Sequence, residues 1–206
     1  MNKYWIIFLI FFLGVNSAIL AQEGNEYTLV IEGFDWAAAA NKVILPIGEK
    51  VSTADSKAYK VSVSRYTECQ KLPLSAASGD RTVIHAYVSD AEGNKQAEEE
   101  YITLVMSVSP NDILDAPMQY FSNSKCRGNQ WIDYQLVITD SSSQRIWNKE
   151  KRRILPLVDQ FDLDAKFKYN DQLTMSYASY KPNTENKKIP LIIWLHGGGE
   201  GGYDPT

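Results

Sequence analysis

The sequence predicts a mainly β protein: an antiparallel β-sandwich followed by the first strands of a second, α/β domain. Apolar and polar residues alternate with a period of two from Tyr27 to about Thr139, which is the side-chain period of a half-buried strand. Turn residues separate the alternating segments, and no long amphipathic helix pattern interrupts them. Further along, Leu191–Leu195 is apolar at every position, as in a parallel strand buried on both faces.

Each expected strand of the sandwich carries a stripe of apolar residues at every second position. Ser89–Asn94 supplies turn chemistry between two such stripes and predicts a hairpin. Short strands of this kind, separated by turns, predict a sandwich of about 100 residues. The stripes are Leu29 and Ile31; Tyr59, Val61 and Val63; Ile84, Ala86 and Val88; Ile102, Leu104, Met106 and Val108; and Ile132, Tyr134, Leu136 and Ile138.

The chain is expected to divide into four segments. Residues 1–21 form a leader, 22–140 the sandwich, 141–165 a linker and 166–206 the start of the second domain. The linker begins with the polar turn Ser141–Gln144 and includes the basic run Lys149–Arg153, which we interpret as a solvated connector. The second domain opens with the alternating stretch Leu173–Tyr180.

The N-terminus has the pattern of a secretory signal peptide. Lys3 precedes an apolar stretch, Tyr4–Leu13, and a small residue, Ala21, marks the expected cleavage site. The alternative is an uncleaved transmembrane anchor, which normally needs about 20 apolar residues. We expect a secreted or periplasmic protein that begins at Gln22 and keeps no stable membrane anchor.

The two cysteines are interpreted in that compartment. Cys69 and Cys126 would lie in oxidising surroundings, where a disulfide persists, and two cysteines allow one intramolecular pairing. Two separately buried thiols are the alternative. The sequence leaves both possibilities open.

Composition and spacing argue against several classes of function. A net charge of -4 and a pI near 5.3 offer no basic surface for nucleic acid. The two histidines and two cysteines lack the spacing of a zinc site. The acidic residues Asp159, Asp162 and Asp164 lack the glycine and the terminal glutamate of a calcium loop. We therefore expect no metal and no cofactor.

A glycine-rich loop follows the last apolar run. His196, Gly197, Gly198 and Gly199 place backbone N–H groups where no side chain obstructs a ligand. The loop has no Lys-Ser/Thr pair for a phosphate-binding loop, because Gly202 is followed by Tyr203. A dinucleotide fingerprint fits only because nearly every residue is glycine. Such N–H groups can stabilise a developing oxyanion.

The strand followed by His-Gly-Gly-Gly resembles the oxyanion-hole loop of α/β-hydrolases. The stretch from Lys166 to Asp204 resembles the start of the catalytic domain in secreted esterases of the prolyl-oligopeptidase-like group. Those enzymes carry an immunoglobulin-like domain in front, and Ile31–Trp36 and Arg81–Asp90 resemble that domain. The resemblance implies an immunoglobulin-like sandwich, then a hydrolase that acts on ester or peptide substrates.

By that resemblance the backbone around Gly197 and Gly198 would hold the tetrahedral intermediate of acyl transfer. His196 would shape the loop, and Glu200 would order it or line the substrate rim. The nucleophile, acid and base would lie downstream of Thr206, since no G-x-S-x-G elbow occurs in the chain. We expect the chain to be an N-terminal fragment that is inactive alone, and we assign no catalytic residue to it. His85 lies within an expected strand and is interpreted as a strand residue.

A function of another class is also compatible with the sequence. The sandwich could be a secreted module that binds polysaccharide or protein without catalysis. Trp36, Trp131 and Trp147 could then form a sugar-binding platform, although tryptophan in a sandwich usually belongs to the core.

Overall fold

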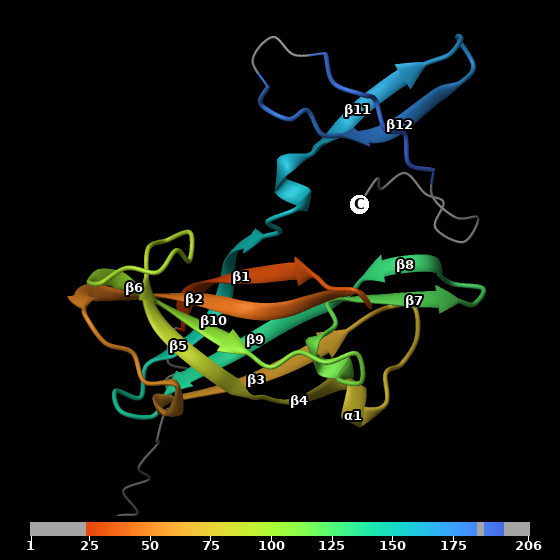
Figure 1. The fold of residues 1–206 in the computed structure, drawn as a ribbon. Coiled ribbons are helices and arrows are strands. Elements are labelled where there is room, and N and C mark those ends of the chain that lie inside the picture. Colours follow the sequence, from red (N-terminus) through yellow and green to blue (C-terminus); the bar gives the residue numbers. More distant parts are fainter. Residues whose placement is uncertain (1–23, 185–187, 196–206) are drawn as a thin grey trace, which may run out of the picture.

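The computed structural model describes residues 24–184 and 188–195, and most of its ordered elements are strands. The prediction of a mainly β protein is confirmed. Eight strands form one sheet (Figure 1). These are β1 (Asn25–Gly33), β2 (Ala38–Val51), β3 (Tyr59–Tyr66), β4 (Ser78–Arg81), β5 (Val83–Ser89), β6 (Glu99–Met106), β9 (Asp133–Asp140) and β10 (Ile146–Ile154).

The remaining elements are short. Two hairpins stand apart from the main sheet: β7 (Met118–Ser122) with β8 (Arg127–Trp131), and β11 (Asp162–Lys168) with β12 (Thr174–Ser179). Figure 1 shows the β11–β12 hairpin projecting from the body of the sandwich. The helical turns are η1 (Ser56–Ala58), α1 (Leu74–Ala77), η2 (Ile113–Asp115) and η3 (Val158–Gln160). In the described part of the chain, no helix is long and apolar enough to cross a membrane.

The main sheet has the order β4-β3-β9-β10-β1-β2-β6-β5. Neighbours are antiparallel except β1 and β10, which are parallel. Only Thr82 separates β4 from β5, although these strands are the two edges of the sheet. The edges therefore meet, and the sheet curls into two facing layers around one core.

β10 joins the two layers. It pairs with β9 only at Ile146 and Trp147, and then runs parallel to β1. The interior of the sandwich is filled by inward residues of β1, β2, β3, β5, β6, β9 and β10. Among the largest buried side chains are Trp147, Tyr27, Tyr134, Leu29, Ile44, Leu45, Leu104, Met106, Leu136 and Ile138.

The predicted strands agree closely with this sheet. The expected hairpin around Ser89–Asn94 is the antiparallel β5–β6 pair, and the alternating stretch Leu173–Tyr180 contains β12. Ile84 is an exception, since it is 60% exposed. A register shift between Val83 and His85 interrupts the alternation there.

Two segments differ from the predictions. The proposed linker, 141–165, contains β10, a central strand, so the sheet extends beyond residue 140. Its charged residues Lys149–Arg152 occupy exposed positions while Trp147 is buried, which is why it resembled a connector. Leu191–Leu195 was predicted to be a buried strand, but it forms no strand and its side chains are 73–89% exposed. A strand buried on both faces needs partner strands and covering layers, and the described residues provide none for this segment.

Candidate functional site

A loop at one end of the sandwich is held in place by a buried arginine. Arg81, at the end of β4, is only 3% exposed. Its guanidinium donates hydrogen bonds to the carbonyl oxygens of Ser107 (2.7 Å) and Leu114 (3.2 Å), which lie on the connection from β6 to β7. It also donates to the Tyr134 hydroxyl and to the carbonyl of Ala40. One side chain thus ties this connection, which includes η2, to β2 and β9.

A second buried arginine holds the end of the same loop. Arg65 of β3 donates from Nε to the carbonyl of Ala116 at 3.1 Å and from its Nη1 to the carbonyl of Ala76 at 2.7 Å. Burial lowers the pKa of Arg65. The loop is therefore fastened to the sandwich by two desolvated cations.

The buried carboxylate of Asp115 holds the two ends of the loop together by a hydrogen bond within the loop. It accepts a hydrogen bond from the backbone N–H of Ser109 at 2.7 Å. Burial raises its pKa, and this effect is opposed by the Ser109 hydrogen bond and by the charges of Arg81 and Arg65. Because hydrogen bonds hold the loop internally as well as to the strands, its exposed residues are fixed in position.

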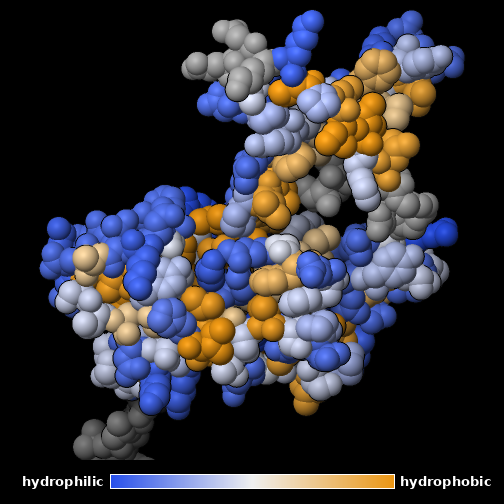
Figure 2. Space-filling view, in the orientation of Figure 1, coloured by the Kyte–Doolittle hydropathy of each residue, from blue (hydrophilic) through white to orange (hydrophobic). Residues whose placement is uncertain are grey.

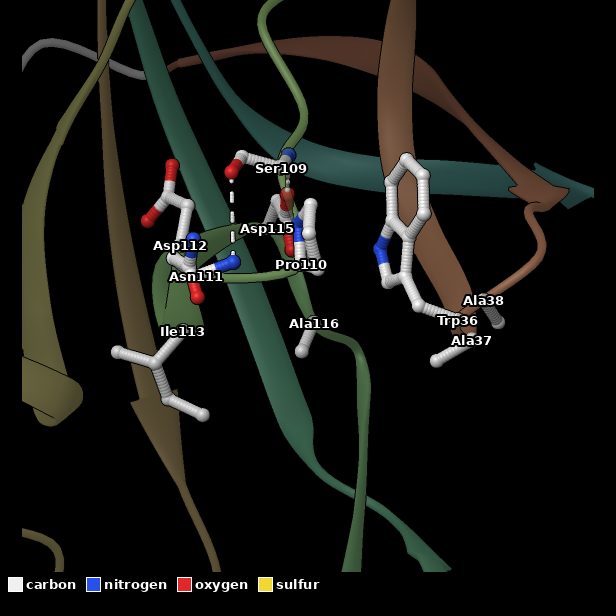
Figure 3. A pocket seen from close by; sticks show the side chains of 10 residues that line it. All are labelled: Trp36, Ala37, Ala38, Ser109, Pro110, Asn111, Asp112, Ile113, Asp115 and Ala116. Carbon is white, nitrogen blue, oxygen red and sulfur yellow. Dashed lines mark hydrogen bonds between the residues drawn. The ribbon is translucent and has the colours of Figure 1, made fainter.

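These exposed residues line an open hollow of about 300 Å³ (Figure 3). Trp36, on the turn between β1 and β2, stands across the hollow from the loop. Its indole stacks on Phe34, with ring centroids 5.0 Å apart and planes 17° apart. Asn111, Asp112 and Ile113 lie on the opposite wall. The space between the two walls is lined by small side chains, those of Ala37, Ala38, Ser109 and Ala116.

The three tryptophans proposed as a sugar-binding platform have different surroundings. Trp147 is 1% exposed in the core and donates its indole N–H to the carbonyl of Pro46 at 3.2 Å. Trp131 is half-buried beneath the guanidinium of Arg153, 5.7 Å from the ring centroid. Trp36 is 44% exposed. The three-tryptophan platform is therefore not formed, and of these three residues Trp36 presents an exposed indole.

The two cysteines form a disulfide, with Cα atoms 5.4 Å apart. The bridge joins the segment after β3 to the β7–β8 hairpin. Cys69 also lines a second open hollow, together with Tyr66, Trp131 and other residues.

The β11–β12 hairpin has one apolar and one polar face. Phe167 pairs with Met175 and Ala165 with Tyr177, so these four side chains share a face. The alternate positions, Lys166 with Ser176 and Lys168 with Thr174, are polar. Phe167, Met175 and Tyr177 are each about half exposed, and Figure 2 shows hydrophobic side chains gathered over this hairpin. The described residues provide no layer that covers this apolar face.

Comparison with known families identifies the sandwich. The family described as "Esterase Ig-like N-terminal domain" matches residues 26–151, more than half of the 206-residue chain. The chain belongs to the esterase Ig-like N-terminal domain family. The matched range ends inside β10, which supports the extension of the Ig-like domain beyond residue 140.

A solved structure has the same fold. It is described as "Crystal Structure of a Thermostable Esterase", with a TM-score of 0.68 and 18% sequence identity. The match covers 87% of this chain and 49% of that one, so the chain spans about half the length of the esterase it resembles. No curated protein sequence matches the chain.

The residues predicted to form an oxyanion hole lie outside the described residues. These are His196, Gly197, Gly198 and Gly199, together with Glu200. Within the described residues, no three His, Cys, Asp or Glu side chains are arranged to hold a metal ion. His85 is exposed on β5, with its ring 5.8 Å from that of Tyr87.

Sequence reasoning missed the residues that shape the loop of the Ig-like domain. Arg65 lies two positions after Val63, on the same stripe as Val61 and Val63, and all three are buried. A charged residue at an inward strand position requires buried partners. That signal identifies Arg65 from the sequence as a residue that organises its surroundings, although it does not reveal the partners.

Proposed function

We propose that the chain is the N-terminal part of a secreted serine hydrolase, an esterase or peptidase that transfers an acyl group to water. The observation that carries this proposal is the match of residues 26–151 to an Ig-like domain found at the N-terminus of esterases. In the sequence this domain is followed by an apolar run and then His196–Gly199. In α/β-hydrolases a strand followed by an HGGG-type loop supplies part of the oxyanion hole.

The proposed roles of the glycine loop follow from its composition. Backbone N–H groups near Gly197 and Gly198 stabilise the oxyanion of the tetrahedral intermediate, and one such donor contributes about 3 to 4 kcal/mol in other enzymes. His196 shapes the loop, and Glu200 orders it or lines the substrate rim. The nucleophile, acid and base belong to a part of the protein that is not in this sequence. The substrate is an ester or a peptide.

The proposal includes export from the cytoplasm. Residues 1–21 form a signal peptide with cleavage near Ala21. The Cys69–Cys126 disulfide supports this assignment, because disulfides persist in oxidising compartments. Mass spectrometry of the exported protein should give an N-terminal peptide that begins at Gln22, and a retained leader would contradict cleavage.

The hydrolase proposal is tested first on the gene. Reading the DNA past the codon for Thr206 should give an open frame with a G-x-S-x-G elbow and, later, an acid and a histidine. An immediate stop codon would contradict the proposal. If the frame continues, the longer protein is expressed and assayed with p-nitrophenyl esters and with peptide p-nitroanilides, which separates esterase from peptidase.

A matched pair of variants then tests the oxyanion hole. In the longer protein, Gly198→Val should lower kcat by about 10²- to 10³-fold, because its side chain displaces the loop N–H groups. Gly202→Ala, outside the proposed hole, should have little effect. Equal activity in the two variants would remove the loop from the mechanism.

A second candidate function is a secreted binding module without catalysis. Among the described residues Trp36 supports it, because its exposed indole borders a preformed hollow. An immediate stop codon would favour this second function.

A further inference from the structure

We propose that the hollow between Trp36 and the loop of η2 binds a neutral saccharide. This inference concerns the Ig-like domain alone and does not depend on the hydrolase proposal. Its basis is an exposed aromatic ring, a facing set of polar groups and a loop made rigid by buried arginines. The volume of about 300 Å³ lies at the lower end of the range for small-molecule sites.

Trp36 provides the apolar wall. Phe34 stacks on one face of the indole, so the 44% exposure of Trp36 belongs to its other face and its edges. Ile113, 41% exposed, adds apolar surface on the opposite side of the hollow. A sugar ring has one face of C–H groups, and such a face can pack against an immobilised indole with little loss of side-chain entropy.

The loop provides the polar wall. Asn111 carries an amide that can both donate and accept, and it is exposed. Asp112 uses Oδ1 to accept the backbone N–H of Leu114 at 3.0 Å, and its second oxygen has no hydrogen-bond partner among the described residues. The Ser109 hydroxyl oxygen accepts the N–H of Asn111 at 3.3 Å (Figure 3). Together these groups match the hydroxyls of a sugar.

The charge of the hollow favours a neutral ligand. Within the part of the chain that the structure describes, no lysine or arginine lines the hollow, so an anion finds no counter-charge among these residues. Of its two carboxyl groups, Asp115 is only 3% exposed and already accepts a hydrogen bond from the Ser109 N–H, and the charges of Arg81 and Arg65 oppose the effect of burial on its pKa. Asp112, which is half-buried, is the other carboxylate in the lining, and it alone is a weak basis for binding a cation.

Preorganisation of the loop supports a binding role. Arg81 and Arg65 together donate to the carbonyls of Ser107, Leu114 and Ala116. Burying two guanidinium groups is costly unless their hydrogen bonds are made. The result is a fixed loop that lies across the hollow from Trp36 (Figure 3). A site that is rigid before binding loses less entropy on binding.

The test is calorimetric titration of the protein with cellohexaose, xylohexaose and mannohexaose, and with an oligolysine peptide as a cationic comparator. We expect at least one hexaose to bind. Trp36→Ala should weaken that binding at least about tenfold, whereas Trp36→Phe should stay within about threefold of the unchanged protein. Asn111→Ala should weaken it several-fold. Tyr66→Ala removes an exposed aromatic side chain of the second hollow and should leave binding unchanged.

Three results would overturn the proposal: no binding of any hexaose, binding that Trp36→Ala leaves intact, or binding of oligolysine alone. The last would assign the hollow to a cationic protein segment. Circular dichroism of each variant confirms its fold. If Trp36→Ala unfolds, the other two variants still decide the question. Weaker saccharide binding in Asn111→Ala, with binding retained in Trp36→Phe, supports the site. Unchanged saccharide binding in Asn111→Ala contradicts it.

Discussion

The hydroxyl oxygen of Tyr27 accepts a hydrogen bond from the backbone N–H of Leu136 at 2.9 Å. Tyr27 is on β1 and Leu136 on β9, and β10 lies between these strands in the sheet order. β10 pairs with β9 only at Ile146 and Trp147, so β10 provides no ladder partner for Leu136. A side chain takes the place of the missing strand, and it joins the two layers where the sheet divides.

Replacing Tyr27 with phenylalanine should therefore destabilise the protein. The change leaves the N–H of Leu136 buried without a partner, which costs about 1–3 kcal/mol. Guanidinium unfolding measures the loss. Tyr66→Phe, at a position 62% exposed, is the control and should change stability by less than about 0.5 kcal/mol. Equal stability of the two variants would show that Leu136 has another acceptor.

Stability should fall in alkaline solution. Burial raises the pKa values of Tyr27, Tyr59 and Tyr134 to about 12. The unfolded chain ionises its tyrosines near pH 10, while the folded state keeps these phenols neutral until about pH 12. Between these values the unfolded state loses protons first, so the free energy of unfolding decreases as pH rises.

The size of this decrease can be assigned to single residues. Tyr27 and Tyr134 are each 1% exposed, and two pKa units correspond to about 3 kcal/mol for each of them. The free energy of unfolding is measured at about pH 8 and about pH 12, in the unchanged protein and in Tyr27→Phe. The loss between the two pH values is then compared. A variant whose alkaline loss is not smaller would contradict the assignment to Tyr27.

Arg81→Met should cost more than about 3 kcal/mol, because three carbonyls and the Tyr134 hydroxyl lose a buried charged donor. The loop of η2 should also become sensitive to protease before the sheet unfolds. Limited proteolysis with mass spectrometry locates the cuts. Arg127→Met, on an exposed position of β8, is the matched control. Absence of new cuts between residues 107 and 117 would show that Arg81 does not fix the loop.

The strands were the predictable part of the fold, and β9 shows why. Tyr134, Leu136 and Ile138 are buried and alternate with exposed positions, so period two in the sequence reports directly on the two environments. β10 lacks that signal, because only Trp147 among Ile146–Ile154 is fully buried and five consecutive residues, Asn148–Arg152, are exposed. Its parallel pairing with β1 depends on contacts more than 100 residues apart, which local alternation does not encode.

The candidate site was predictable only in part, for a related reason. Trp36 and Trp147 are the same residue type, and both were candidates for an exposed sugar-binding platform on the sequence alone. Trp147 is in the core and Trp36 borders the hollow, because one lies on a strand between the two layers and the other on a turn. Asn111 and Asp112 gained significance only when Arg81 and Arg65 placed their loop opposite Trp36.

The Cys69–Cys126 disulfide should contribute strongly to stability. It closes a segment with a sequence separation of 57 residues, and the chain-entropy account gives about 4 kcal/mol for a loop of that length. The Cys69→Ser/Cys126→Ser variant should unfold at lower guanidinium concentration than the oxidised protein. The oxidised protein, denatured without reductant, should react with no thiol reagent. Labelling of both cysteines would show free thiols, and the double variant would then be expected to match the unchanged protein in stability.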